Sequence, residues 1–420
     1  MSRKHRGVVV TGLGVISPIG LDAAELLASV RQNRSGIRLW ESPQLVKKFP
    51  AGIVDRDFSG EFTKLELPYL DRCSQLAILA ARQAARDAGL EAFGAYAQRA
   101  GLFYGSVGGG VATEHEWVRQ FHLENKQLSK PYTIMACMLN AAPAHISIRH
   151  QILGPVMTHS SACTSSGSAI GDAFRAIRDG YLDVAIAGGA EAAMLPTFVA
   201  LWGGLRALAE PDPVDVSRSC RPFSTDRSGL VLGEGAVFLL LESHEHASQR
   251  GAHPYCAMSG FGIASDGYHI GSPKTEGQVA ALRDALRDAG LQAQQIGYIN
   301  AHATATAGGD PVEAAALRDV FKDVPVSSTK AIHGHLLGAA SAMELAVAIL
   351  AVNNSLLPAT AHLDSIDPAC ALNHVANTPI FDHPVEHALS LSAGFGGTNV
   401  ALIVSRENSL PSKALKTTIA

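Results

Sequence analysis

Charged residues are scarce in this chain of 420 residues: Asp, Glu, Lys and Arg make up 17%, whereas 47% of the residues are apolar. The apolar share is enough for a sizeable core, in two domains or in one large duplicated one. With so little charge, we expect much of the surface to be buried between subunits or between halves of the chain. The formal net charge of −4 offers no support for nucleic-acid binding, so no nucleic acid is expected as a partner.

Cysteine is also rare. Six cysteines lie along the chain without regular spacing, which excludes a disulfide framework and a zinc-ligand pattern. We interpret them as the reduced thiols of a cytoplasmic protein.

Membrane and dinucleotide signals are missing as well. No apolar run reaches membrane-spanning length, so no membrane partner is expected. The start MSRKHRGVVVTGLGVISPIG imitates a signal peptide, but glycines and Pro18 interrupt it and predict a strand followed by a loop. The pair Gly12-x-Gly14 and the run Gly108–Gly110 lack the rest of a dinucleotide fingerprint. They are interpreted as turns or close backbone approaches.

Short β-rich runs alternate with Ala- and Leu-rich helical runs, which predicts an α/β fold with buried strands. The predicted strands are RGVVVTGLG, RAGLFYGSV, DVAIAGGAEA, GYINAHATA, VPVSSTK and ALSLSAGFGGTNVALIV. Helices are predicted at 73–89, 279–290 and 338–351.

Two segments repeat one another: AARQAARDAGLEA at 80–92 and ALRDALRDAGLQA at 281–293. A glycine-led strand follows each shortly afterwards, which favours an internal duplication with an active site between the halves. We therefore expect one half at 1–250 and a second at 251–405. The polar tail at 406–420 is expected to be flexible.

The stretch SSACTSSGSAIGDAFRAIRDG holds one cysteine, Cys163, among small residues. Apolar residues after it recur at i, i+3, i+4 and i+7, from Ile170 to Ile177, which predicts a helix. Cys163 then lies near the first turn, where unpaired N–H groups and the helix dipole lower a thiol pKa and favour a nucleophilic thiolate. An inert buried cysteine is the alternative, so the second half must supply a partner.

Candidate partners lie in three segments of the second half. Two histidines and a lysine among them lie at predicted strand ends or in adjoining loops, where ligand sites of α/β folds occur. The candidates are His302, Lys330, His333, His335, Glu344 and Phe395. The pairs His333-x-His335 and His244-x-His246 lack the spacing of a helical zinc site, and no HExxH motif occurs, so no metal is expected. His244 and His246 lie in a polar stretch and are expected to be solvated.

Together these motifs resemble the elongating β-ketoacyl-acyl carrier protein synthases, condensing enzymes of the thiolase fold. The resemblance spans nearly the whole chain and is carried by SSACTSS, DVAIAGGAEA, RPFSTDRSGLVLGEGA, ASDGYHIGSP, NAHATAT, SSTKAIHGHLLGAASAME and GFGGTN. It implies two similar α/β halves in a five-layered αβαβα arrangement. It also implies a decarboxylative Claisen condensation, which extends an acyl chain by two carbons from malonyl-carrier in fatty-acid or polyketide-type synthesis.

The resemblance implies a role for each catalytic candidate. Cys163 is the nucleophile that carries the acyl chain, and His302 and His335 face its thiol. Lys330 arranges the charge around the histidines, with Glu344 in support. Such chemistry needs donors for the oxyanion and enolate but no bound cofactor.

Substrate-contacting positions are implied in the same way. They are Thr304, Thr306, Phe395, Gly396 and Val107. The threonines would meet the phosphopantetheine arm of the acyl carrier protein, Phe395 would be a gate, and its N–H would join that of Cys163 in an oxyanion hole. Val107 would help to set the depth of the acyl pocket.

Partners are implied too. An acidic carrier protein needs a local basic patch on this net-acidic enzyme, for which Arg206 and Lys64 are the candidates, and solvated surface charge is the alternative. A homodimer, or a heterodimer with a related subunit, is expected, and Tyr132 is a candidate to reach across it. The sequence departs from the family where Ala303 replaces a glycine and Ala305 a small polar residue, which can alter the pantetheine channel.

Two other functions compete. Chain-length-factor subunits that pair with ketosynthases typically lack the active cysteine, whereas Cys163, His302, Lys330 and His335 are all present here. A Cys–His hydrolase would leave the second histidine, the lysine and GFGGTN unexplained.

Overall fold

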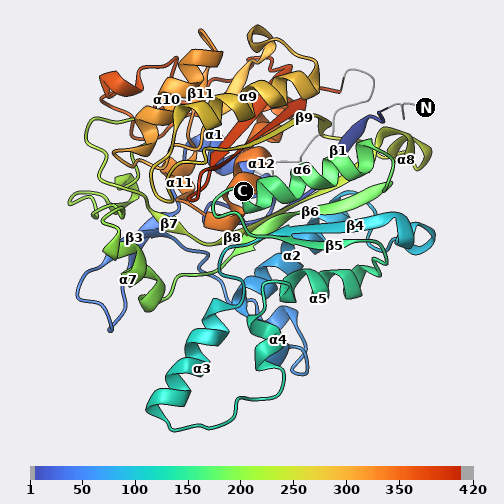
Figure 1. Cartoon of the computed structure of the whole chain (residues 1–420), viewed down its shortest axis with the longest axis vertical. Coiled ribbons are helices and arrows are strands. Elements are labelled where there is room, and N and C mark those ends of the chain that lie inside the picture. Colours follow the sequence, from blue (N-terminus) through green and yellow to red (C-terminus); the bar gives the residue numbers. More distant parts are fainter. Residues whose placement is uncertain (1–4, 408–420) are drawn as a thin grey trace.

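The computed structural model describes residues 5–407 of the chain, which form a mixed α/β protein (Figure 1). From residue 408 on, the predicted flexible tail lies outside the described part. The strands are β1 (Val8–Ile16), β2 (Ile37–Trp40), β3 (Phe49–Gly52), β4 (Ala100–Gly105), β5 (Val156–His159), β6 (Val184–Glu191), β7 (Leu232–Gly233), β8 (Gly235–Ser243), β9 (Cys256–Ser265), β10 (Tyr298–Asn300), β11 (Val326–Ser327), β12 (His387–Ala393) and β13 (Thr398–Ser405).

The α-helices are α1 (Ala23–Gln32), α2 (Arg72–Asp87), α3 (Val111–Leu123), α4 (Thr133–Cys137), α5 (Ala141–His150), α6 (Ser165–Arg178), α7 (Pro196–Gly204), α8 (His244–Gln249), α9 (Thr275–Ala289), α10 (Gly309–Val320), α11 (Lys330–His333) and α12 (Ala340–Asn354). Each predicted strand and helix has a counterpart among these elements, with shifted ends.

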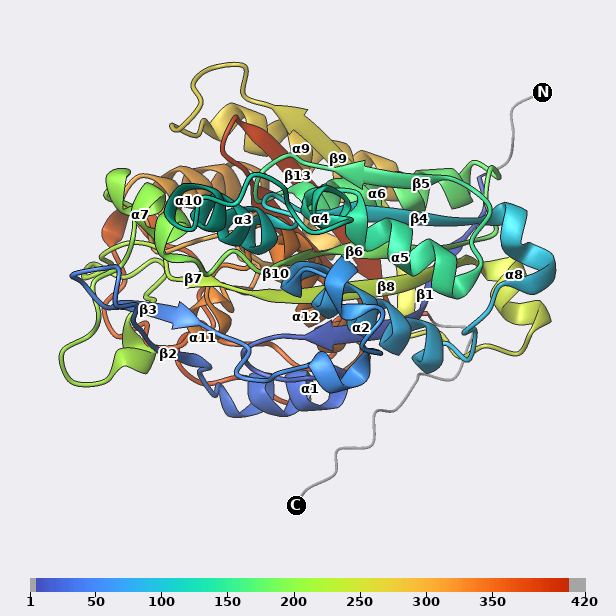
Figure 2. The ribbon, with the colours of Figure 1, turned by 90° about the horizontal axis from the view of Figure 1, so that it is seen from below.

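Within residues 5–407, ten strands form one sheet in the order β11-β10-β12-β13-β9-β1-β8-β6-β4-β5. Read outward from the centre, β1-β8-β6-β4-β5 and β9-β13-β12-β10-β11 have the same topology. In both, the last three strands are parallel and the first three antiparallel. A separate small sheet of β2, β3 and β7 lies at the end of the molecule away from α8 (Figure 2).

The duplication extends to single contacts. The ideal Cβ positions of Gly12 and Gly14 on β1 lie 2.0 and 1.9 Å from the carbonyl oxygens of Ala84 and Ala80 on α2. Gly260 and Gly262 on β9 approach Ala285 and Ala281 on α9 in the same way, at 2.4 and 2.0 Å. Only glycine permits such close packing of helix on strand, so Gly12-x-Gly14 is confirmed as a close backbone approach.

The repeated aspartates have the same function in both halves. Asp87 accepts a hydrogen bond from the N–H of Leu13, and Asp288 accepts one from the N–H of Phe261, both at 3.0 Å. The predicted boundary at residue 250 falls between α8 and β9 and stays a prediction.

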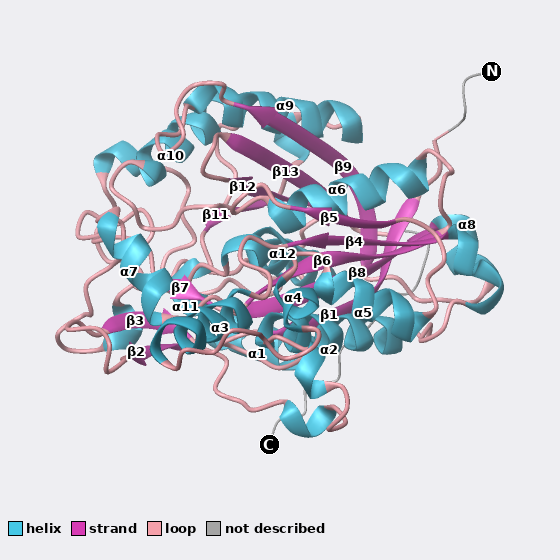
Figure 3. Ribbon diagram, turned by 60° about the horizontal axis from the view of Figure 1, so that its bottom comes forward, coloured by secondary structure: helices cyan, strands magenta, loops and turns pink. Residues whose placement is uncertain are grey.

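Helices separate the two halves of the sheet and cover it outside, as Figure 3 shows. Helices α6 and α12 contact each other and the inner faces of the two halves, whereas α2 and α5 cover one outer face and α9 the other. The result is the expected five-layered αβαβα arrangement.

Helix α12 is the core of the middle layer. The 18 residues Leu337–Asn354 are long and apolar enough to cross a membrane, but 89% of this segment is buried inside the protein. The expectation that no apolar run reaches that length was therefore wrong here. Burial on all sides of the helix explains its apolar character.

The structure also bears on the expectations for His246 and Tyr132. His246 is buried rather than solvated, because its Nδ1 lies 2.5 Å from the buried Glu242 carboxylate, whereas His244 is partly exposed. Helices α3 and α4 project from the body (Figure 1), and no residue of α3 is buried. Tyr132, in this projection, packs against Tyr69 of its own chain with ring centroids 4.4 Å apart.

Candidate active site

Cys163 lies in the tight turn between β5 and α6, two residues before the helix begins at Ser165. Ala162 adopts a left-handed backbone (φ 54°), and Ser341 on α12 donates a hydrogen bond to the Cys163 carbonyl at 3.0 Å. Gly394 packs against this turn, with its ideal Cβ position 2.8 Å from the Ser161 oxygen. The turn is thus fixed from the second half of the chain, and the thiol is buried.

Two histidines of the second half lie next to the thiol. The Nε2 atom of His335 is 3.0 Å from Cys163 Sγ. The His302 and His335 rings meet edge to face with centroids 5.3 Å apart. The backbone of His335 is held against β7, because its N–H donates to Val231 at 2.7 Å and its carbonyl accepts from Gly233 at 2.9 Å.

Lys330 lies behind the histidines, fully buried at the start of α11. Its ammonium is 3.4 Å from His302 Nδ1 and forms an ion pair with Glu344 on α12. Ser392 donates to the other oxygen of Glu344 at 3.3 Å. The buried charge of Lys330 is thereby paired, as a charge removed from water requires.

Burial governs the titration of these groups. It raises the pKa of the Cys163 thiol to about 12, although Lys330 and the backbone N–H groups of Phe395 and Cys163 lower it. The expectation of a lowered thiol pKa was therefore wrong for this site, because desolvation outweighs the helix start. Burial, and then Lys330, hold the pKa values of His302 and His335 well below the usual range, so both rings are neutral. A neutral His335 can accept the thiol proton.

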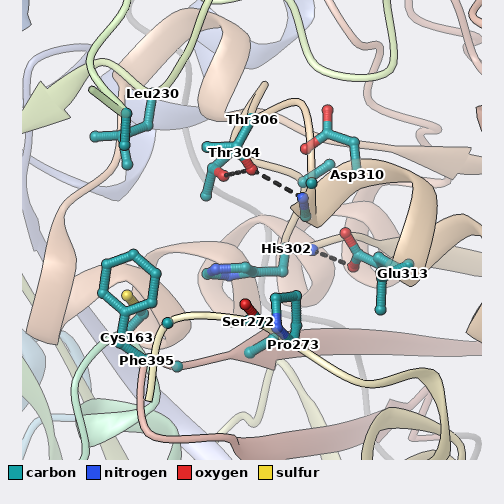
Figure 4. A pocket seen from close by; sticks show the side chains of 18 of the residues that line it. Cys163, Leu230, Ser272, Pro273, His302, Thr304, Thr306, Asp310, Glu313 and Phe395 are labelled. Atoms are coloured by element: carbon teal, nitrogen blue, oxygen red, sulfur yellow. Dashed lines mark hydrogen bonds between the residues drawn. The ribbon is translucent and has the colours of Figure 1, made fainter. Parts of the chain in front are cut away.

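A cavity of about 730 Å³ opens onto the thiol (Figure 4). The predicted residues that line it are Cys163, His302, His335, Thr304, Thr306 and Phe395. The hydroxyls of Thr304 and Thr306 are hydrogen-bonded at 3.3 Å. The Phe395 ring stacks on Trp202 with centroids 5.6 Å apart, and Gly396 follows with a φ of 88°.

Four other predicted residues, Val107, Arg206, Lys64 and Gly396, are not among those that line this cavity. Val107 is half-buried and donates its N–H to Glu191 at 2.9 Å. Arg206 is exposed between Leu205 and Ala207, which line the cavity, so it lies at the cavity's edge. Lys64 is exposed and does not line it.

Sequence reasoning missed several lining residues. Glu313 accepts a hydrogen bond from the His302 N–H at 2.6 Å, and burial raises its pKa to about 8. Burial raises the pKa of Asp310 to about 6. Their place at the start of α10, just after NAHATAT, was an available signal. Apart from a place in or near the quoted motifs, no signal in the sequence marks the other lining residues Trp202, Leu230, Ile270 and Gln278.

The thiol and the two histidines could also bind a metal. Their sulfur and ring nitrogen atoms all lie within 4.8 Å of one another. The Lys330 ammonium next to His302 opposes a cation at this place. The expectation of no metal stays a prediction.

Known proteins share this architecture. The family models for the N-terminal and C-terminal domains of β-ketoacyl synthase match residues 5–247 and 255–364. Nodulation protein E of Rhizobium sp. is 37% identical over 94% of this chain and 98% of its own length. The 3-oxoacyl-[acyl-carrier-protein] synthase 2 of Coxiella burnetii is 34% identical over 96% and 99%.

Solved structures agree in fold. The ishigamide ketosynthase/chain length factor superimposes with a TM-score of 0.89 at 31% identity, covering 96% of this chain and all of that one. The ketosynthase ApeO in complex with its chain length factor ApeC, from Xenorhabdus doucetiae, gives 0.83 at 28%, covering 96% and 98%. With its matching domains, thiolase-like layers and Cys–His–His–Lys cluster, the chain belongs to the β-ketoacyl synthase family of condensing enzymes.

Proposed function

We propose that this chain is an elongating β-ketoacyl-acyl carrier protein synthase in which Cys163 carries the acyl chain. The observation that carries the proposal is the 3.0 Å contact between Cys163 Sγ and His335 Nε2 at the end of the cavity. His335 accepts the thiol proton as sulfur attacks the acyl thioester. The backbone N–H groups of Cys163 and Phe395 stabilise the oxyanion, and the carrier leaves as a thiol.

The second step uses the same cavity. Malonyl thioester loses CO₂, and the electron pair of the broken bond forms an enolate. Neutral His302 and His335 stabilise its oxygen as hydrogen-bond donors. The enolate carbon attacks the acyl-cysteine, and the C–S bond breaks with Cys163 leaving as a thiolate that takes a proton from water. The product, two carbons longer, leaves on the carrier. Burial, and then Lys330 in its ion pair with Glu344, keep the histidines neutral by lowering their pKa values.

The partners follow from this chemistry. A carrier protein supplies both thioesters through its phosphopantetheine arm, in agreement with a related structure of a type II polyketide ketosynthase with its acyl carrier protein. Thr304 and Thr306 contact the arm, and Arg206 and Lys64 contact the carrier. Val107 and Gly396 contribute to acyl and thioester binding. A second subunit, identical or related, contacts the exposed face of α3. Related solved structures hold a ketosynthase with its chain length factor.

The cellular location is part of the proposal. All six cysteines are free and five of them are buried. Unpaired thiols fit a reducing compartment, and we place the enzyme in the cytoplasm.

The test is product analysis. The purified chain receives acyl-carrier and then malonyl-carrier, and the carrier is analysed by intact mass. A 3-ketoacyl chain two carbons longer supports the proposal, whereas free fatty acid and unloaded carrier indicate a hydrolase. The variant His302→Ala should load the acyl chain and form no product. Product that appears only after a related subunit is added would favour the chain-length-factor-like reading.

A further inference from the structure

Gln278 is a buried carboxamide without a partner in the wall of the active-site cavity. It lies in the first turn of α9, is only 1% exposed and lines the same cavity as Cys163, His302, Thr304 and Thr306. Its Oε1 atom is buried with no hydrogen-bond partner among the described residues. Buried polar groups are nearly always hydrogen-bonded, and leaving one unpaired costs free energy. Since Oε1 itself has almost no exposed surface, the carboxamide has to rotate toward the cavity for an entering group to complete the site.

The neighbouring walls restrict what that group can be. Helix α9 packs against α10, whose N-terminal part brings Asp310 and Glu313 to the cavity. Burial raises the pKa values of both groups, so this wall is neutral or negative and favours a neutral hydrogen-bonding group over an anionic one. Ser272, Pro273 and Val312 also line this cavity. A neutral polar ligand group fits this surface better than the malonyl carboxylate or an alkyl chain.

We propose that Gln278 binds an amide group of the pantetheine arm, a specificity contact that rests on the proposed function. A carboxamide offers one acceptor and two donors, and each secondary amide of pantetheine offers one donor and one acceptor. Oε1 accepts from the arm's N–H, and Nε2 donates to its carbonyl. The contact selects donors that carry the amide-containing arm over simple thioesters.

The test compares donors and variants. Wild type, Gln278→Met and Gln278→Glu are acylated with an acyl-pantetheine thioester and with an amide-free alkyl thioester of the same acyl chain. Stopped samples analysed by intact mass give the half-saturating donor concentration and the maximal rate. Gln249→Met, at an exposed position of α8, is the matched control. Thermal unfolding of each variant establishes that it is folded.

With acyl-pantetheine, Gln278→Met should raise the half-saturating concentration about tenfold, as the loss of one or two hydrogen bonds predicts. The maximal rate should stay within about twofold, and the alkyl thioester should show no change. Gln278→Glu keeps the size and one acceptor, so it should lose less and serves if the Met variant does not fold.

Two results would overturn this inference and leave the proposed function intact. One is an equal rise in the half-saturating concentration with both donors, and the other is no rise with acyl-pantetheine. A wild type that no acyl-pantetheine or acyl-carrier acylates would overturn the proposed function as well.

Discussion

The sulfur of Cys163 and the Nε2 atom of His335 lie 3.0 Å apart, although 172 residues separate them in the chain. Each belongs to one copy of the duplicated fold, and the central helices α6 and α12 bring the copies together. The site therefore depends on the docking of the two halves and is absent from either half alone.

His335 should be required for acyl loading. Because burial raises the thiol pKa to about 12, attack on a thioester needs a proton acceptor, and His335 is the ring within hydrogen-bond distance. We expect His335→Ala to slow acylation of Cys163 by about 10²- to 10⁴-fold, the usual contribution of a general base. Rapid-quench intact mass measures this rate. The exposed His253 supplies a control, His253→Ala, and equal rates in both variants would exclude the role.

Variants of the Lys330–Glu344 ion pair should affect stability and activity to different extents. Both side chains are fully buried, so Lys330→Met or Glu344→Gln leaves an uncompensated charge and should lower the free energy of unfolding by about 3–5 kcal/mol. The double variant removes both charges and should recover most of this loss but not condensation activity. Chemical denaturation and product assays measure the two effects. A double variant as unstable as the sum of the single ones would contradict this explanation.

Ala305 should show backbone strain that Ala303 lacks. Both are buried in the NAHATAT segment, but only Ala305 has a positive φ, 67°. Glycine loosens the unfolded chain equally at either position, so the difference between the variants isolates the strain. We expect Ala305→Gly to be more stable than Ala303→Gly by about 1–2 kcal/mol. Denaturation midpoints at equal slope measure the difference, and equal stabilities would contradict it.

The thiolate of Cys163 should form only at high pH. Below its pKa, each unit of pH raises the thiolate fraction about tenfold, so a pKa of about 12 for Cys163 predicts that alkylation by iodoacetamide keeps accelerating from pH 7 to pH 10. Cys163→Ala corrects for the other free thiols, of which Cys137 is only partly buried. A rate that is already constant between pH 7 and pH 8 would indicate a lowered pKa instead.

Much of the fold could be predicted because local sequence patterns, such as hydrophobic periodicity and internal repeats, determine its helices and strands. The repeated AARQAARDAGLEA and ALRDALRDAGLQA became the equivalent outer helices α2 and α9, down to the hydrogen bonds of Asp87 and Asp288. Most catalytic candidates were found because they follow a strand or lie at the start of a helix, as His302 follows β10 and Lys330 begins α11. The order of the motifs along the chain, which resembles that of the β-ketoacyl synthases, then assigned these candidates to one site.

The rest depends on burial, which the sequence does not report position by position. A helix start predicts a lowered thiol pKa, but desolvation reverses the direction for Cys163. His246 stands in a polar stretch, yet it folds onto the buried Glu242. Gln278 carries no motif of its own, and it becomes notable only because its carboxamide is buried in the cavity wall.

The most direct test of the central claim is the intact mass of the protein after exposure to an acyl-loaded carrier, measured beside the variant Cys163→Ala. The account predicts one acyl group on the wild type, assigned to Cys163 by peptide mapping, and none on the variant. An acyl group on both proteins, or on neither across donors of different chain length, would contradict Cys163 as the nucleophile.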